Sequence, residues 1–535
     1  MAQVPVEPET LLSQLRTADL LGALSLAADL AVGLPEEHAV RACYIGMHIA
    51  ERLGLSADQR AALYYAELLM DAGCTAWTSQ LAVAIVGDEI VARRAFVYRG
   101  DDRNPFDVLS WLKDYVGVEA PPPLRAARVL AFALHGRANA REAFRNTCEV
   151  AQRFAGRLGM PAEVQRALLS IFEQWDGHGP HGARGEQIPL VSRIVYATSF
   201  IEAFHRIGGR AAALRLARRR RGSAFDPAVV DAFLAVSRGA AFWEGLEQES
   251  VWSTVLALEP VSSWRYVAPA QLEDVALAFA DFADLKSAFS AGHSRRTADV
   301  SERMARRLAL PAAETAHVRR AALLHDLGLV AVPSFTLEKP EAKRTAIERE
   351  RLRLHPYHAE RILASVPALA PAVPLIAAHH ERIDGQGYYR GLSGSQIPLG
   401  ARIIAVADRF DELTHAAPGH PAFDPRTALQ QLRVEAGSNL CPQALGALDD
   451  TLALGGPAAA AQRRQPPRQW PAGLTDREVE ILRLLARGAS RRQVAQQLVL
   501  SEHTVRHHLE HIYNKVGVST RVAATLFAVE HGLLP

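Results

Sequence analysis

Cysteine is scarce in this 535-residue chain, and none of it forms a CxxC pair. Such widely spaced residues do not suggest a thiolate zinc site, and four of them in a chain of this length do not suggest a disulfide framework. The cysteines are Cys43, Cys74, Cys148 and Cys441. Sparse, isolated cysteine fits a reducing compartment, so we expect a cytoplasmic protein.

The chain also lacks a strong net charge and a long hydrophobic run. Lys+Arg number 60 and Asp+Glu 58, so any nucleic-acid-binding surface must be local. Prolines interrupt the longest apolar stretch, 362–378, and the first residues are acidic and polar where a signal peptide would be basic. We therefore expect neither a membrane span nor a signal peptide.

Alternating β-branched residues are rare, and apolar residues recur instead at helical spacing. One example is the series Leu272, Val275, Ala276, Phe279, Phe282 and Ala283. This periodicity predicts an all-α fold, and the chain length predicts several domains.

The chain repeats itself. The interval from His38 to Asp71 is 33 residues, and the interval from His293 to Asp326 is also 33. LLMDAG surrounds the first aspartate and LLHDLG the second, and IPLVSRI later in the first copy matches IPLGARI in the second. We predict two tandem, homologous helical bundles.

A Pro-, Gly- and Ala-rich stretch, GGPAAAAQRRQPPRQWPAG, shows no amphipathic period and predicts a flexible linker. With the repeat, it divides the chain into five predicted parts. These are a first helical module at 1–240, a helical connector at 241–284, a second module at 285–454, the linker at 455–473 and a final domain at 474–535.

The second module contains seven histidines and aspartates of the kind that bind divalent cations. They are His293, His325, Asp326, His355, His379, His380 and Asp408. A lone His-Asp dipeptide is more often polar surface or a helix cap, but here several motifs occur in order. HSRRT at 293, LLHDLG at 323, HPYHAERIL at 355, HHERIDGQGYYRGL at 379 and IPLGARIIAVADRFDEL at 397 together resemble the HD-GYP family of metal-dependent phosphodiesterases.

The resemblance implies an all-α bundle whose cleft holds two divalent metal ions, usually iron or manganese, and a phosphodiester substrate, usually cyclic di-GMP. It implies one metal set of His293, His325, Asp326 and Asp408. It implies a second set of Asp326, His355, His379 and His380, with Asp326 shared and central to catalysis.

Three positions depart from the family pattern. Leu329 stands where the family has a lysine that meets the substrate phosphate, and Tyr389 replaces the proline of GYP. Phe289 stands where members with three metals have a glutamate, so we expect two metals. Loss of the lysine removes a positive charge from the site unless another cation replaces it. The candidates are Arg296, Lys339 and Arg382, of which we assign the first two to the catalytic site.

The first module has lost most of these ligands. Of the matched positions, only His38 and Asp71 remain, and the lost ones are Met70, Ile171, Phe172 and Ser199. Two ligands do not hold a divalent pair tightly, so we expect no catalysis there. The module is then a structural or dimerisation scaffold, which we favour, or a regulatory pocket for a small ligand.

The last domain contains repeated helix-capping patterns. Thr475 with Glu478 and Ser490 with Gln493 form capping boxes, and we place further N-caps at Ser501 and Ser519. GASRRQVAQQLVLSEHTVRHHLEHIYNKVGVSTR resembles the LuxR-type helix-turn-helix. A helical protein-interaction domain requires the same apolar period but does not predict the SEHTVRHH pattern.

The resemblance implies a four-helix domain that binds double-stranded DNA, with the helix near 502–515 in the major groove. By analogy we expect Thr504, Val505 and His508 at the bases or their backbone. We expect Arg491, Arg506 and Lys515 at the phosphates. One short helix contacts few bases, so we expect a homodimer on repeated half-sites.

The sequence as a whole predicts a transcriptional regulator in which a dinuclear-metal phosphohydrolase module senses or hydrolyses a phosphorylated ligand such as cyclic di-GMP. Two alternatives stay open. One is a non-catalytic sensor of nucleotide and metal that controls transcription, and the other is a phosphatase that acts on a different phosphate ester.

Overall fold

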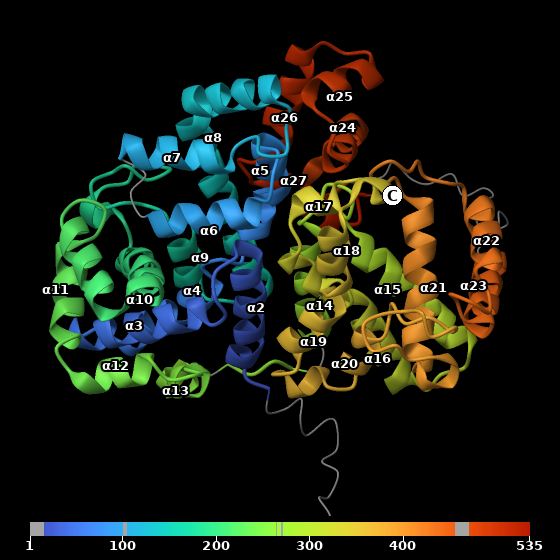
Figure 1. Ribbon diagram of the computed structural model, residues 1–535, viewed down its shortest axis with the longest axis horizontal. Coiled ribbons are helices and arrows are strands. Elements are labelled where there is room, and N and C mark those ends of the chain that lie inside the picture. Colours follow the sequence, from blue (N-terminus) through green and yellow to red (C-terminus); the bar gives the residue numbers. More distant parts are fainter. Residues whose placement is uncertain (1–14, 100–103, 264, 269–270, 455–469, 535) are drawn as a thin grey trace, which may run out of the picture. The chain divides into compact units, whose positions relative to one another are not determined.

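The computed structural model describes residues 15–99, 104–263, 265–268, 271–454 and 470–534, and its regular elements in these ranges are all helices (Figure 1). The predicted all-α fold is confirmed. None of the described helices is both long enough and apolar enough to cross a lipid bilayer. Most of the predicted linker, 455–469, lies outside the described residues.

Internal contacts divide the chain into two compact units. The first consists of 1–275 with 333–335 and 365–368, and the second of 276–332, 336–364 and 369–535. Helix α14 (Gln271–Asp284) begins in the first unit and ends in the second. The predicted domain boundaries remain predictions.

The first unit begins with three helices, α2 (Thr17–Val32), α3 (His38–Arg52) and α4 (Ala57–Leu69). Helix α3 packs against α4 and α10, and buries His38 completely. The remaining elements of this unit are η1 (Cys74–Trp77), α5 (Thr78–Ile85), α6 (Glu89–Arg99), α7 (Pro105–Tyr115), α8 (Pro122–Arg157), α9 (Ala162–Leu168), η2 (Gly185–Gln187), α10 (Leu190–Arg220), α11 (Pro227–Val236), α12 (Ala240–Leu246), α13 (Trp252–Leu258) and η3 (Val261–Ser263).

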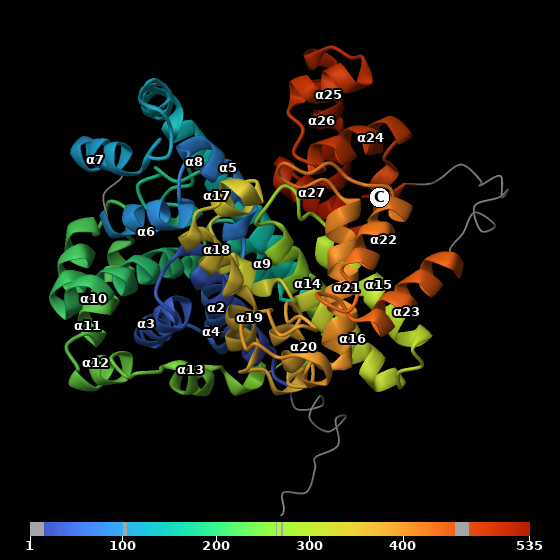
Figure 2. The same cartoon turned by 45° about the vertical axis from the view of Figure 1, so that its right-hand side comes forward.

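The second unit places α15 (His293–Arg307) beside α16 (Ala312–Leu324), α21 (Leu399–Thr414) and α23 (Pro442–Leu454), as Figures 1 and 2 both show. The rest of this bundle consists of η4 (Leu327–Ala331), η5 (Glu341–Lys343), α18 (Ala346–Arg353), α19 (His355–Leu363), α20 (Val373–Ala377), η7 (Gly394–Gln396) and α22 (Pro425–Val434). Two short elements, α17 (Ser334–Leu337) and η6 (Pro367–Leu369), each begin in the first unit and end in the second.

A buried aspartate caps the first histidine-bearing helix in each copy. Asp29 accepts from the backbone N–H of His38 at 2.9 Å, and Asp284 accepts from the backbone N–H of Ser294 at 3.1 Å and from its hydroxyl at 2.7 Å. Each aspartate precedes the histidine, His38 or His293, by nine residues. A side-chain oxygen there satisfies backbone donors that a helix start leaves unpaired, so both copies begin in the same way.

A close approach of two helices fixes a further correspondence between the copies. A Cβ on Gly328 would overlap the carbonyl oxygen of His355, and a Cβ on Gly73 would overlap that of Thr147. Both glycines lie two residues after the retained aspartate. Thr147 therefore occupies the position of His355, a substitution that the sequence comparison missed because α5, α6, α7 and the first part of α8 precede Thr147 in the first copy.

The C-terminal domain has four helices, α24 (Asp476–Ala486), α25 (Arg491–Leu498), α26 (Glu502–Val516) and α27 (Arg521–Glu530), preceded by η9 (Pro471–Gly473). Both predicted capping boxes are present, and Ser501 caps α26. The predicted cap at Ser519 is wrong by one residue, because the Thr520 side chain accepts from Ala523 N–H and α27 begins at 521.

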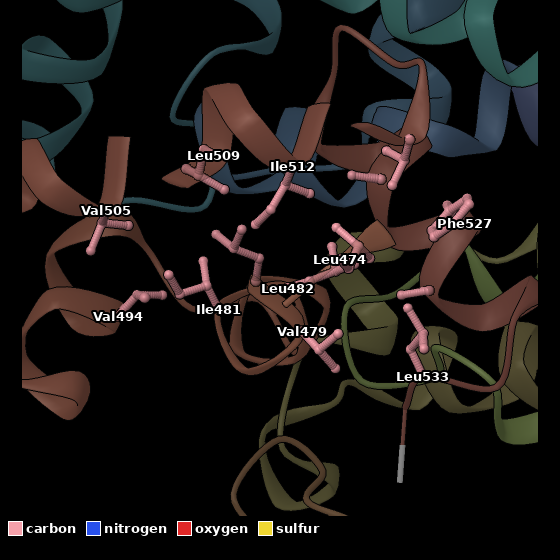
Figure 3. Packing of buried hydrophobic residues seen from close by; sticks show 14 of the residues in the cluster. Leu474, Val479, Ile481, Leu482, Val494, Val505, Leu509, Ile512, Phe527 and Leu533 are labelled. Carbon is pink, nitrogen blue, oxygen red and sulfur yellow. The ribbon is translucent and has the colours of Figure 1, made fainter. Parts of the chain in front are cut away.

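Side chains from all four helices meet in one small core. Figure 3 shows Ile481 and Leu482 of α24 among Val494 of α25, Val505 and Ile512 of α26 and Phe527 of α27. Because these side chains point into the core, the opposite face of α26 is exposed.

Candidate functional site

Six of the seven predicted metal ligands lie at or near helix ends of the second unit. His293 and His355 are the first residues of α15 and α19, His325 directly follows α16, and His379 follows α20 by two residues. Asp408 lies inside α21. Short helices that end in the bundle interior thus bring side chains from five segments to one place.

One ligand group surrounds the imidazole of His293. Its Nε2 lies 3.4 Å from Nε2 of His325, 3.5 Å from Oδ2 of Asp326 and 3.2 Å from Oδ1 of Asp408. Three of these residues, His293, His325 and Asp408, can offer one ligand atom each to a single ion. The site is buried, with His325 fully so and His293 9% exposed.

A second ligand group lies on the other side of Asp326. Oδ1 of Asp326 is 3.3 Å from Nε2 of His355, which is 3.1 Å from Nε2 of His379. His355, His379 and His380 form another set that can hold one ion. Because Oδ2 of Asp326 faces the first group and Oδ1 the second, this carboxylate is placed to bridge two ions.

The imidazole tautomers fit metal binding. Nδ1 of His325 donates to the carbonyl of Ala322 at 2.8 Å, and the corresponding nitrogens of His355 and His379 donate to backbone carbonyls at 2.7 and 2.6 Å. The proton on Nδ1 leaves Nε2 of each neutral ring with a lone pair. The Nε2 lone pairs of His355 and His379 face each other across 3.1 Å. A cation bound between the two nitrogens would remove the repulsion between these lone pairs.

Burial also keeps the second group neutral. Burial, together with the charge of His325, lowers the pKa of His379 to about 3. Burial lowers the pKa of His355 and of His380 as well. Burial alone would lower the pKa of His325, but the carboxylates of Asp326 and Asp408 raise it to about 9. Neutral imidazoles are the form that binds a metal.

A second carboxylate orients the first histidine, and sequence comparison missed it. Nδ1 of His293 donates to Asp411 at 2.7 Å, and Arg296 donates to both oxygens of Asp411 at 2.7 and 2.9 Å. Asp411 is 5% exposed. A carboxylate behind a ligating histidine fixes the orientation of the imidazole ring and raises its basicity. The sequence signal for this role was the position of Asp411 three residues after Asp408, on the same face of α21.

Glu381 was also missed, and it organises the loop that follows His380. Its carboxylate accepts from the backbone N–H groups of Arg390, Gly391 and Leu392 at 2.7, 3.1 and 3.0 Å. Within this loop the ring of Tyr388 stacks on His380, with centroids 4.9 Å apart. The hydroxyl of Tyr389 donates to Glu360. The loop is therefore fixed by side chains where the family has a proline.

The three candidate replacement cations are all paired with carboxylates. Arg296 is held by Asp411, Lys339 Nζ lies 2.6 Å from Glu348, and Arg382 donates to Asp384. Contact with a substrate phosphate would require each cation to share or exchange its partner. The catalytic roles of Arg296 and Lys339 stay predictions.

In the first copy, apolar side chains and an ion pair occupy the matching region. His38 Nδ1 pairs with Glu202, which also accepts from Arg206 at 2.6 Å, and His38 Nε2 lies 3.2 Å from the hydroxyl of Ser199. Met70 and Ile171 are each 2% exposed. Among the described residues, the groups able to hold a metal ion all lie in the second unit.

The predicted DNA-contacting residues fall into two groups. Arg491, Arg506 and Lys515 are exposed and Thr504 and His508 are partly exposed, although Lys515 also lies 2.7 Å from Glu478. Val505 is fully buried in the core of Figure 3, so its assignment to the DNA surface is wrong. Its place on the core side of α26 leaves no side-chain atom for a base.

Two family models match this chain. The HD domain matches residues 278–443, and the luxR family of bacterial regulatory proteins matches residues 472–528. The 3′3′-cGAMP-specific phosphodiesterase 3 of Vibrio cholerae is 31% identical over 438 residues, which cover 82% of this chain and 95% of that protein.

Two further comparisons agree with these matches. A crystal structure of a cyclic GMP-AMP specific phosphodiesterase of V. cholerae has a TM-score of 0.58 at 29% identity, covering 82% of this chain and 98% of the other. The cyclic di-GMP phosphodiesterase response regulator RpfG of Xanthomonas campestris is 39% identical over 155 residues, which cover 29% of this chain and 41% of that protein.

Proposed function

This chain belongs to the HD-GYP-type phosphodiesterases and ends in a luxR-family DNA-binding domain, and on that premise we propose that it hydrolyses a cyclic dinucleotide and regulates transcription in response. The observation that supports this proposal best is the position of Asp326, whose two oxygens face two separate groups of buried ligands. Relatives that act on cyclic di-GMP or 3′3′-cGAMP support the substrate class.

The proposed cofactor is a pair of divalent ions, iron or manganese, held by the seven ligands already described. Such a pair, when bound, lowers the pKa of a water and neutralises charge on a phosphodiester. The chain's own residues orient the ligand imidazoles through backbone carbonyls and Asp411, and burial keeps the imidazoles of the second group neutral. Most of the ligands are buried, which strengthens electrostatic interactions among them.

A second candidate is a sensor that binds nucleotide and metal without turnover. It is favoured by Leu329, which supplies no charge, and by the pairing of Arg296, Lys339 and Arg382 with carboxylates. In either case we propose that the protein is cytoplasmic, binds double-stranded DNA and acts as a homodimer, since paired half-sites suit a single short recognition helix.

One experiment separates the two candidates. The full chain is incubated with cyclic di-GMP or 3′3′-cGAMP, under reducing conditions with Mn²⁺ or Fe²⁺, and the products are separated by chromatography. We expect linear dinucleotide or mononucleotides from the parent and none from His325→Ala. Nucleotide binding without any product would reject hydrolysis and establish the sensor. A matched control is His317→Ala, a substitution outside the ligand set.

A further inference from the structure

Histidines form a row along α26, the helix that the luxR-family domain uses to read DNA. His503, His507 and His511 follow one another at intervals of four residues, and all three are exposed. Residues four apart lie on the same face of a helix. The rings of His507 and His511 lie with centroids 4.3 Å apart, so the two imidazoles are already neighbours.

This row lies on the outward face of the helix. Val505, Leu509, Ile512 and Val516 point into the domain core and are at most 8% exposed. In the helical repeat, positions 503 and 507 fall opposite these core positions. The early and middle part of this face is what a recognition helix presents to the major groove. The histidine row and the DNA-binding face therefore coincide.

The imidazoles of the row have free nitrogens. In the part of the chain that the structure describes, the rings of His507 and His511 contact each other, and His503, His507 and His511 make no hydrogen bond or ion pair. The nearby carboxylate of Glu510 lies 3.7 Å from Arg506. Two histidines at this spacing on one helix face form a known zinc-binding arrangement, and imidazole also suits Cu²⁺ and Ni²⁺.

We propose that His507 and His511, with His503 extending the row, bind a divalent transition-metal ion on the DNA-reading face, and that the bound ion excludes DNA. The hydrated ion occupies the space that base edges would fill, and the ligating nitrogen of each imidazole can no longer hydrogen-bond to a base. The second half of this inference rests on the proposed DNA-binding function, whereas the metal site itself does not.

The metal site is tested first by zinc binding to the full chain. The HD site is saturated with Mn²⁺, and Zn²⁺ is then titrated by calorimetry into the parent, into His507→Gln/His511→Gln and into the control His531→Gln. His531 is an exposed histidine of the same domain outside α26. We expect the double variant alone to lose one equivalent of zinc. Equal zinc stoichiometry in all three proteins would overturn the site.

Exclusion of DNA is tested with a fluorescent duplex of mixed sequence at low salt, where sequence-independent binding is measurable. Zinc should raise the Kd for DNA of the parent and of His531→Gln, and should leave that of the double variant unchanged. Zinc binding with an unchanged Kd in the parent would overturn the exclusion. A parent that binds zinc through these histidines but no duplex would instead reject the proposed DNA function and leave the metal site supported.

Discussion

His293 donates from Nδ1 to the carboxylate of Asp411 across 2.7 Å, and the first copy contains the same relationship between His38 and Glu202. Each carboxylate lies three residues beyond the position of the ligand aspartate, Asp408 in one copy and Ser199 in the other. The histidine is thus oriented by the fold in both copies, but only the second supplies ligands around it.

Asp411→Asn should weaken metal binding and activity by roughly 10- to 100-fold, because a neutral amide no longer fixes the His293 tautomer. Asp411→Glu should recover most of the loss, since glutamate serves at this position in the first copy. Metal retained after gel filtration and the hydrolysis rate provide the measurement. The control is Asp449→Asn, which removes a surface ion pair with Arg433. Unchanged metal content in Asp411→Asn would contradict the positioning role.

Metal counting should reveal the shared carboxylate. We expect two equivalents of Mn²⁺ or Fe²⁺ per chain in the parent, one in His355→Ala and none in Asp326→Ala, because Asp326 faces both ligand groups. Elemental analysis of the purified proteins provides the count, with circular dichroism to confirm that each variant stays helical. Two equivalents in Asp326→Ala would show that this carboxylate is not shared.

Leu329→Lys should raise kcat/KM for cyclic dinucleotide hydrolysis by about tenfold, because a lysine would stabilise the negative charge that the phosphate carries in the transition state. Leu329 is partly exposed and lies in η4, three residues after Asp326, so a longer side chain has room. Initial rates at low substrate concentration give the comparison, with Leu329→Met as the uncharged control. Equal rates for the two variants would argue that another residue already provides the charge.

Stability of the first unit should fall as the pH rises. Burial alone would lower the pKa of His38, but Glu202 raises it to about 9, above its usual value of about 6.5. The ion pair therefore contributes fully below pH 6.5, and its contribution is lost as the pH rises through about 9. Glu202→Gln should cost on the order of 2 kcal/mol at pH 6 and much less at pH 10.

Urea unfolding followed by tryptophan fluorescence measures this effect, because six of the seven tryptophans belong to the first unit. The control is Glu247→Gln, which removes an ion pair with Arg210 at the surface of the same unit. If Glu202→Gln lowered the free energy of unfolding by the same amount at both pH values, the ion pair of His38 with Glu202 would not titrate in this range.

Arg506→Ala should weaken DNA binding about equally for all sequences. It should also reduce the slope of log K against log salt concentration by about one, the value expected for the loss of one phosphate contact. Arg506 is exposed near the start of α26, and its guanidinium lies 3.7 Å from the carboxylate of Glu510. Fluorescence anisotropy at several salt concentrations gives the slope. Arg307→Ala, which removes a surface ion pair with Asp450, should leave the slope unchanged. A slope equal to that of the parent would place Arg506 away from the phosphates.

Ligand positions could be predicted from the sequence because the metal-binding chemistry restricts them to histidine and aspartate in a fixed order. Supporting residues could not. Asp411 and Glu381 act through geometry that appears only when separate segments meet, and the correspondence of Thr147 with His355 was hidden by the helices inserted before it. Helix caps were predictable because they are local, although the N-cap of α27 is Thr520 and not Ser519.

The error at Val505 has a different cause. Analogy by position placed it on the DNA side, whereas in the structure it lies in the core with Leu509 and Ile512, at the apolar spacing of α26. The structure follows the period, because burial of an aliphatic side chain stabilises so small a domain by about 1.5–3 kcal/mol. Where the two kinds of inference conflict in a short helix, the hydrophobic pattern is the stronger guide.

The close helix approach at Gly73 and Gly328 has a consequence for detecting relatives of this protein. A Cβ would strike a backbone carbonyl at both positions, so the glycine persists in the copy that has lost its catalytic ligands. In LLMDAG and LLHDLG the shared glycine thus indicates common ancestry and folding, whereas only the histidine of the second copy indicates metal chemistry. Genome surveys that accept the aspartate and glycine alone will count inactive copies as enzymes, and requiring the histidine separates the two populations.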